Sequence, residues 1–290
     1  MPNILKEIKN YLFRFMPDSW YLHYIYWRKM GTRLNLKNPQ TFNEKLQWLK
    51  LYDRNPLYTT LVDKYAVKKW VADKIGEQYI IPTLGVWNSF DEIDFDKLPE
   101  QFVLKTTHDS KGVVICLDKQ TFDREAARQK LTKALCANFY DQGREWPYKN
   151  VKPRILAEKF MEDAQTKELR DYKFFCFGGE VKMLFVAVDR QHPTEETKFD
   201  FFDMNFVHLP FTNGHPNATH LPEKPQNFTG MKNLASVLSA GIPHVRVDFY
   251  EVNGKVYFGE MTFFHWGGFM RFTPPQWDKT IGDWLTLPKN

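Results

Sequence analysis

The sequence predicts an α+β protein with mainly antiparallel sheets and an N-terminal helical segment. Helical signals dominate the first 79 residues, whereas apolar, β-branched runs outnumber helical patterns after residue 80. Several neighbouring runs in that second part are joined by short glycine-containing turns, which favour hairpins over parallel crossovers. At 290 residues the chain is long enough for two lobes, each with its own core.

Residues 4–30 form an aromatic and basic segment, which Pro17-Asp18-Ser19 divides into two predicted helices with Asp18 or Ser19 as the second cap. This composition fits an anionic membrane interface, and it also fits packing on the main body with the basic groups solvated. Because Met30-Gly31 leads into the rest of the chain without a flexible linker, we favour packing. Peripheral membrane contact through these helices is the alternative.

The other predicted elements follow from local start and stop signals. Thr41 and Glu44 have the spacing of a capping box, which opens a helix through Tyr52. A helix over 57–75 ends at Gly76, a typical C-terminal cap. The remaining elements are strands at 80–87, 101–108 and 113–117, a helix at 122–140, strands at 154–161, 172–177, 181–189 and 199–207, and a helix at 230–240.

The clearest hairpin signal is Asn253-Gly254, which lies between two apolar runs. Asp248 interrupts the first run and Glu260 the second, and a carboxylate in a half-buried strand is costly without a positive partner. A two-residue turn would point Glu260 to the other face, whereas a three-residue loop or a bulge would place it opposite Asp248. Facing carboxylates would form the oxygen-rich site that Mg²⁺ prefers. The alternative is that both are solvated strand residues.

Composition and charge narrow the class of protein. A net charge of +5, spread along the chain, fits an anionic small ligand better than a nucleic-acid surface, which would show a concentrated basic stripe. The three cysteines are widely spaced and predict neither a disulfide framework nor a metal motif. No signal peptide is recognised, and no apolar run approaches the ~20 residues of a membrane span. We therefore expect a cytoplasmic protein that binds no nucleic acid.

A lysine in the strand at 101–108 marks a candidate phosphate site. Lys105 interrupts an apolar run, and the turn His108-Asp109-Ser110-Lys111-Gly112 follows it. Successive backbone N–H groups in such a turn form a concavity for phosphate oxygens, and Lys105 adds a positive charge. The alternative is that Lys105 is a solubility residue at a sheet edge.

Two further segments have residues suited to a nucleotide. The backbone of Glu158-Lys159-Phe160-Met161 could read a purine edge while its apolar side chains enclose the ring, although a strand end with an apolar run looks the same. Asp171 and Lys173 lie at alternate positions of one strand and so share a face. Lys173 could neutralise phosphate and Asp171 could accept a ribose hydroxyl, or the two could form a simple ion pair.

As a series, these segments resemble the ATP-grasp superfamily, and most closely its branch typified by the teichuronopeptide biosynthesis protein TupA. The resemblance runs from about residue 25 to the end of the chain. It implies a two-lobed fold with a helical region at 1–79, a phosphate-lysine lobe at 80–157 and a lobe with the metal hairpin at 158–290. The matching stretches are 38–45, 63–67, 102–105, 171–175, 246–249, 259–263 and 275–278.

The resemblance also implies roles for individual residues. ATP would be held by Lys105, by His108, Ser110, Lys111 and Gly112 of the turn, by Glu158, Lys159, Phe160 and Met161, and by Asp171. Mg²⁺ would be held by Asp248, Glu260 and Thr262, and the catalytic residues would be Arg246 and Lys173. The chain departs from the family pattern at Thr262, where asparagine is usual, and at Asp109, where relatives carry glycine.

The function that the resemblance implies is that of an ATP-dependent ligase, which joins a carboxylate-bearing sugar or amino acid to an amine through an acyl phosphate. The setting would be biosynthesis of a cell-surface polysaccharide, with an acidic or lipid-linked glycan as a further acceptor. A glycosyltransferase is the alternative, since Asp94-Phe95-Asp96 has the spacing of a metal motif for nucleotide sugars. That motif lies in an acidic connection, which favours a solvated loop. A third alternative is a binding protein on a degenerate ATP-grasp fold.

Overall fold

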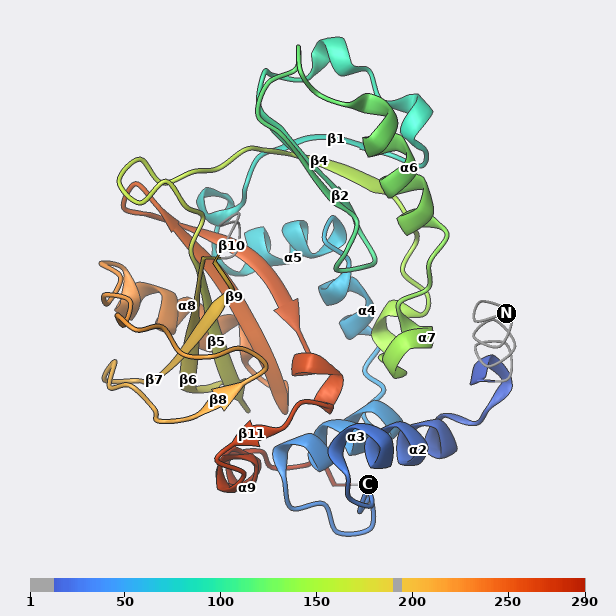
Figure 1. Ribbon diagram of the computed structural model, residues 1–290, viewed down its shortest axis with the longest axis vertical. Coiled ribbons are helices and arrows are strands. Elements are labelled where there is room, and N and C mark those ends of the chain that lie inside the picture. Colours follow the sequence, from blue (N-terminus) through green and yellow to red (C-terminus); the bar gives the residue numbers. More distant parts are fainter. Residues whose placement is uncertain (1–12, 190–194, 290) are drawn as a thin grey trace.

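The computed structural model describes residues 13–189 and 195–289 and contains two main antiparallel sheets (Figure 1). The four-stranded sheet lies above the five-stranded sheet in this view, with helices α4 (Leu57–Val62) and α5 (Ala66–Ile75) at the level between them. The predicted α+β class, with antiparallel sheets and N-terminal helices, is therefore confirmed. The part of the first predicted helix within residues 1–12 lies outside the described residues.

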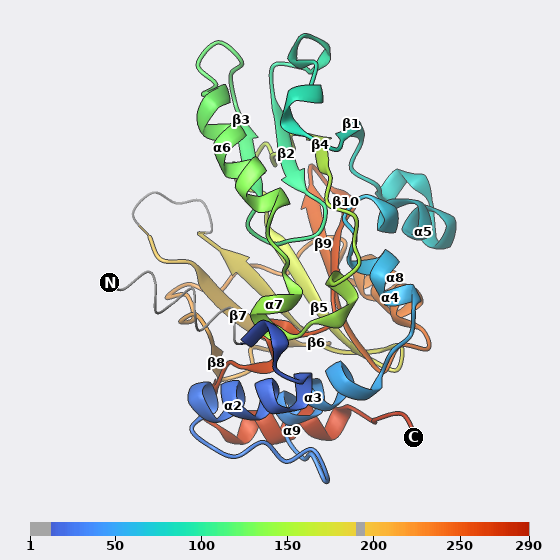
Figure 2. The same cartoon turned by 90° about the vertical axis from the view of Figure 1, so that its right-hand side faces the viewer.

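Helix α2 (Asp18–Met30) packs beside α3 (Phe42–Tyr52) at the base of the molecule (Figure 2). Pro17 occupies the cap position of α2, so the predicted caps at Asp18 and Ser19 are wrong. Asp18 is instead the first helical residue, where a carboxylate favours the positive end of the helix dipole. Its Oδ1 accepts a 2.5 Å hydrogen bond from the hydroxyl of Tyr140. The capping box predicted for α3 is confirmed.

The predicted single helix over 57–75 is wrong, because it is divided into α4 and α5 at Asp63. The Asp63 carboxylate accepts hydrogen bonds from the backbone N–H groups of Tyr65 and Ala66, at 2.9 and 3.2 Å. Bonds of this kind satisfy orphan donors at the start of a helix and so favour a new helix over continuation of the old one. The break brings the 63–65 segment against the four-stranded sheet, where Lys64 N–H donates to Thr107 O at 3.0 Å.

The four-stranded sheet has one face for the core and one for the site. In the strand β2 (Phe102–Thr106), Phe102 and Leu104 are fully buried beneath α6 (Arg124–Leu135). Val103 and Lys105 therefore point to the opposite face of the sheet. The predicted helix over 122–140 ends early, at residue 135. The strand order is β1 (Thr83–Trp87), β4 (Ile155–Lys159), β2 (Phe102–Thr106) and β3 (Val113–Cys116).

The five-stranded sheet forms most of the main core. Helix α8 (Phe228–Ser239) covers one face, where Phe228, Met231 and Ala235 pack among the buried aromatic residues of the sheet. The other face faces the four-stranded sheet. The strand order is β10 (Lys255–Thr262), β9 (His244–Val252), β5 (Asp171–Phe177), β6 (Glu180–Val188) and β7 (Lys198–Asp203).

The hairpin of β9 and β10 decides where the predicted metal ligands point. Lys255 pairs with Val252, so the turn at Asn253-Gly254 has two residues and the three-residue loop is not formed. A bulge between Phe258 and Met261 then shifts the register by one residue. The shift places Glu260 opposite Asp248, so the bulge, one of the two arrangements expected to bring these carboxylates together, is confirmed.

Short elements complete the described chain. The lobe division at 79/80 and 157/158 stays a proposal, and its second boundary falls within β4. Within the described residues, none of the helices has the length and apolarity that crossing a membrane requires. The short elements are η1 (Glu77–Tyr79), η2 (Phe90–Glu92), η3 (Phe95–Lys97), α7 (Tyr140–Gly143), η4 (Trp146–Tyr148), β8 (Thr212–Asn213), η5 (His265–Gly268), β11 (Phe272–Thr273) and α9 (Gln276–Trp284).

Candidate functional site

The floor of the candidate site is a cluster of charged side chains on β5, β9 and β10. Arg246 lies at its centre and donates two 2.7 Å hydrogen bonds to the two oxygens of Asp248. Its Nη2 also donates to Glu260 Oε1 at 3.2 Å and to Thr262 Oγ1 at 3.0 Å. Burial acts to lower the pKa of Arg246, but Asp248 and Glu260 outweigh it and raise that pKa. The hairpin therefore brings the predicted metal ligands Asp248, Glu260 and Thr262 into contact with Arg246.

The buried carboxylates on the floor are paired with Lys173. Its amine lies 2.5 Å from Asp248 Oδ2 and 3.1 Å from Asp171 Oδ1. Asp171 and Asp248 are both fully buried, and an unpaired charge there would be costly. For Asp171 the structure thus has the ion-pair arrangement that was the alternative to ribose binding. Lys173 is 7% exposed and lies on the face of the sheet that carries the site.

His265 contacts the guanidinium of Arg246 through a ring nitrogen. Arg246 Nη1 lies 3.0 Å from His265 Nδ1, and His265 Nε2 lies 3.0 Å from Asn213 Oδ1. Because a guanidinium can only donate, Nδ1 is the acceptor and Nε2 carries the proton. Burial and the charge of Arg246 lower the pKa of His265 well below its ordinary value, which agrees with a neutral ring. His265 therefore acts in this structure as a support for Arg246.

The roof of the site, on the four-stranded sheet, carries a second cluster. Glu158 pairs with Lys105 at 2.7 Å and with Lys68 of α5 at 2.5 Å. Burial acts to raise the pKa of Glu158, but the two lysines outweigh it and the pKa is lowered. Glu158 therefore positions the predicted phosphate lysine, and its carboxylate is engaged by lysines.

The predicted phosphate turn is closed by Asp109. Its Oδ1 accepts a 3.1 Å hydrogen bond from Gly112 N–H and another from the hydroxyl of Thr106, so the carboxylate points into the turn. Within the described residues, the N–H groups of Ser110 and Lys111 donate no intramolecular hydrogen bond, and both residues are exposed. These donors are the kind that hold phosphate oxygens.

His108 and Gly112 at the ends of the turn have structural roles. His108 is 2% exposed, and its Nε2 lies 3.0 Å from Ala137 O. A Cβ added to Gly112 would lie 1.9 Å from Thr106 Oγ1, so only glycine fits at this position. The turn is therefore built to keep a fixed shape below Lys105.

Lys64 lies between roof and floor and was not predicted as a site residue. Its amine donates to the backbone oxygen of Asp109. Burial lowers the pKa of Lys64, and the nearby carboxylates of Glu260, on the floor, and Asp109 oppose that change. Lys105 is a further charged neighbour. Asp63 was the sequence signal that could have located it, because aspartate is typical of the residues before a helix start and so indicates a helix break beside this lysine.

The segment predicted to enclose adenine lies at the far end of the roof. Lys159 pairs with Phe102 at the start of β2, four residues from Thr106 beside the phosphate turn. At ~3.3 Å per residue this separation is about 13 Å. Lys159 and Phe160 line a surface hollow of about 650 Å³, and Met161 is not among its lining residues. Phe160 therefore lies near the start of β2, whereas the phosphate turn follows the end of β2.

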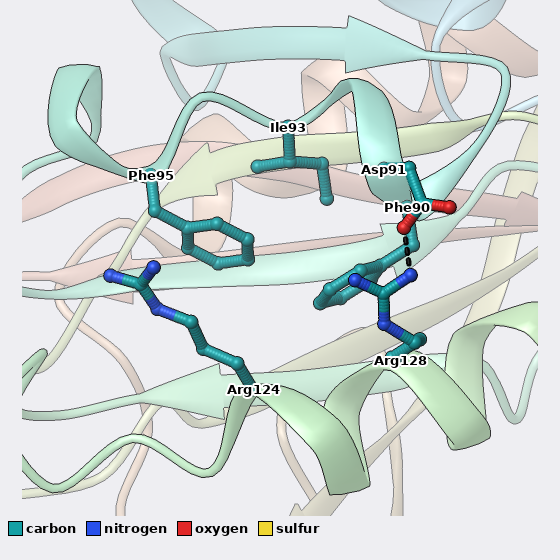
Figure 3. A pocket seen from close by; sticks show the side chains of 6 residues that line it. All are labelled: Phe90, Asp91, Ile93, Phe95, Arg124 and Arg128. Carbon is teal, nitrogen blue, oxygen red and sulfur yellow. Dashed lines mark hydrogen bonds and ion pairs between the residues drawn. The ribbon is translucent and has the colours of Figure 1, made fainter.

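A second hollow, of about 490 Å³, lies on the small lobe between η2, η3 and α6 (Figure 3). Arg124 stacks over Phe95 at 4.7 Å and Arg128 over Phe90 at 5.1 Å, so both guanidinium groups pack on aromatic rings. The nearby Asp94-Phe95-Asp96 does not form a metal motif in this structure. Asp94 accepts from Asp96 N–H and pairs with Lys97 at 3.0 Å, as expected for a solvated loop.

The residues on the floor fit a divalent cation in their chemistry. Asp248, Glu260 and Thr262 present hard oxygen donors, which Mg²⁺ prefers. The Glu260 side chain is 38% exposed, whereas Asp248 is fully buried and both of its oxygens are bound by Arg246 and Lys173. Among the described residues no group of three or more His, Cys, Asp or Glu side chains is placed to hold a metal. In proteins Mg²⁺ is commonly held by one or two carboxylates together with substrate phosphates.

Comparison with known proteins gives one match in sequence and several in structure. The family model described as TupA-like ATPgrasp matches residues 44–286. The ATP-grasp ligase PsnB complexed with its minimal precursor is 10% identical over 72% of this chain and 54% of that chain, with a TM-score of 0.42. D-alanine–D-alanine ligase from Bacillus anthracis is 19% identical over 70% of this chain and 57% of that chain, with a TM-score of 0.40.

The corresponding ligase from Helicobacter pylori is 15% identical over 85% of this chain and 69% of that chain, with a TM-score of 0.40. No curated protein sequence matches this chain. This chain spans little more than half the length of the first two structures.

Proposed function

Because the chain belongs to the TupA-like ATP-grasp family, we propose that it is an ATP-dependent carboxylate–amine ligase. One observation supports this most directly. The groups that we propose to bind phosphate, Lys105 and the turn at 108–112, belong to the four-stranded sheet, and the oxygen donors that we propose for Mg²⁺ belong to the facing five-stranded sheet. Lys64 lies between them. Mg²⁺–ATP has phosphate and metal at neighbouring positions and so complements both sides.

The proposed reaction has two steps. A substrate carboxylate oxygen attacks the γ-phosphorus of ATP, which forms an acyl phosphate and releases ADP. The neutral amine then attacks the acyl carbon, inorganic phosphate leaves, and the amine nitrogen loses its proton. Lys105, Lys173 and Lys64 would neutralise negative charge on the transferred group, and Arg246 would steady the acyl phosphate. Mg²⁺ on Asp248, Glu260 and Thr262 would supply further positive charge when bound.

The role of His265 follows from its contact with Arg246. A neutral histidine accepts one N–H of the guanidinium and leaves the opposite edge directed at Asp248, Glu260 and Thr262. Arg246 therefore keeps one orientation without an additional buried charge. This type of support preorganises a site for charge that develops during reaction.

The substrates that we propose come from the family and not from the geometry. They are a carboxylate-bearing sugar or amino acid and an amine, in the biosynthesis or modification of a cell-surface polysaccharide such as a capsule, O-antigen or teichuronopeptide. An acidic or lipid-linked glycan is the proposed acceptor. Since ATP is made inside the cell, we place the reaction in the cytoplasm, including the inner face of the membrane.

The test is a thermal-shift titration with ATP in the presence and absence of Mg²⁺. A ligand at a hundredfold excess over Kd adds about 2.7 kcal/mol, which should raise Tm by roughly 5–10 °C in a chain of this size. We expect the shift to require Mg²⁺ and to vanish in Asp248→Ala/Glu260→Ala. The matched control, Asp94→Ala/Asp96→Ala, should keep the full shift. A shift with a UDP- or GDP-sugar and none with ATP would overturn the proposal.

A further inference from the structure

The helix α2 has one packed face and one aromatic face that is open to solvent. Tyr21, Leu22 and Tyr26 are at most 4% exposed and pack in a small core of their own with Leu34 and Phe269. This packing confirms the preferred prediction for the described part of the N-terminal segment. It also leaves the opposite side of the helix without cover from the described residues.

Two tryptophans dominate the open side. Trp20 is 71% exposed and Trp27 is 56% exposed, and their spacing of seven residues places them two turns apart on the same stripe. Together with Ser19, His23 and Tyr24 they line a shallow hollow of about 570 Å³. We name these five residues the aromatic face of α2. Contiguous exposed apolar surface of this kind marks an interaction site.

The segment that contains the aromatic face is basic in composition, and of its basic side chains Lys29 lies over the ring of Phe269 on the packed side of α2, at 5.1 Å. Residues 13–37 contain five lysines and arginines and one acid, Asp18. Asp18 accepts from Tyr140 and pairs with Arg144, so its charge is already neutralised. The five basic residues are all exposed; they are Arg14, Arg28, Lys29, Arg33 and Lys37.

We propose that the aromatic face of α2 docks this protein on an anionic membrane surface. Tryptophan and tyrosine rings suit the level of the lipid headgroups, and flanking basic side chains attract anionic lipids. A helix that lies in the interface plane presents an aromatic stripe along its length, and Trp20, Tyr24 and Trp27 follow one side of α2 in this way. Each basic side chain near the surface adds to the attraction, and salt weakens it.

Two other occupants fit less well. A second copy of this chain would oppose one basic surface with another, which repels. A glycan site needs several convergent polar groups, whereas the polar groups of the aromatic face are spread along two turns of one helix; they are the side chains of Ser19 and His23, the Tyr24 hydroxyl and the two indole N–H groups. The inference does not depend on catalysis, so it can fail while the proposed ligase activity holds.

The test is co-sedimentation of the full chain with vesicles of phosphatidylcholine alone or mixed with phosphatidylglycerol. We expect at least about tenfold stronger binding to the anionic vesicles, and a decrease as salt is raised. Trp20→Ala/Trp27→Ala should reduce that binding at least about tenfold. Both side chains are exposed, so this variant should keep the wild-type Tm.

The matched control is Leu117→Ala/Val207→Ala, which removes two side chains that are 59% and 60% exposed outside α2. It should bind vesicles like the wild type. The inference is overturned if anionic vesicles are not bound, if neutral vesicles bind equally well, or if the tryptophan variant binds unchanged. Self-association or binding of an acidic polysaccharide that the tryptophan variant loses, without vesicle binding, would also overturn it.

Discussion

Replacing Lys64 by methionine tests whether this residue joins the nucleotide site. The substitution keeps most of the side-chain volume and removes the charge beside the phosphate turn. Hydrogen bonds to charged groups are worth about 1.5–3 kcal/mol, and the Coulomb energy of two charges 4 Å apart at an effective dielectric constant of 20 sets a ceiling near ~4 kcal/mol. We therefore expect Kd for Mg²⁺–ATP to rise roughly 10- to 150-fold.

The measurement is isothermal titration calorimetry with a nonhydrolysable ATP analogue and Mg²⁺. Lys69→Met is the matched control, because Lys69 lies nearby on α5, its side chain is 84% exposed and its partner is Asp73 on the same helix. The control should bind within twofold of the wild type. If Lys64→Met also binds within twofold while its Tm is unchanged, the amine of Lys64 does not contact the nucleotide and the reasoning is refuted.

Two further predictions concern the small sheet. Gly112→Ala should lower the free energy of unfolding by about 1–3 kcal/mol, because the added Cβ overlaps Thr106 Oγ1. The control Gly230→Ala places its Cβ in open space on α8 and should raise the free energy of unfolding by up to ~1 kcal/mol. Urea unfolding of both variants measures these changes. The pKa of Glu158 is lowered in the folded state, so its contribution to stability is complete above the unfolded pKa of about 4.3 and is lost as the pH falls through the folded pKa. Urea unfolding of Glu158→Gln and wild type from pH 7 to pH 3 should show a difference in stability that shrinks towards acid pH; a difference that stays constant would contradict the ion pairs.

The parts of the structure that could be predicted from sequence are those fixed by local chemistry. Thr41 and Glu44 are three residues apart and cap α3 by themselves. Asn253-Gly254 forms the two-residue turn because both residues adopt positive φ, at 50° and 73°. The bulge that aligns Glu260 with Asp248 was one of two arrangements considered. The residues of the turn do not determine whether the bulge forms, because the bulge lies several residues away from them.

What could not be predicted depends on contacts between distant segments. The partner of Arg246 is His265, which is itself held by Asn213, 52 residues away in the chain. Glu158 looked like part of an adenine site because its two lysine partners lie on other elements. From sequence Lys64 is expected inside a helix, but the Asp63 carboxylate binds the N–H groups of Tyr65 and Ala66 and the helix is broken there. In each case no local pattern identifies the partner.

The two facing sheets divide the formal charge of the site unequally. The floor has three carboxylates, Asp171, Asp248 and Glu260, against two cations. The roof, taken together with the adjoining Lys64, has the three amines of Lys64, Lys68 and Lys105 against the carboxylates of Glu158 and Asp109. The two halves therefore carry opposite net charge and attract one another across the opening. The floor repels the phosphates of Mg²⁺–ATP, and the roof repels its metal ion. If the site holds a nucleotide as proposed, we expect affinity to rise with the number of phosphates, because each added phosphate brings negative charge to the amines of the roof.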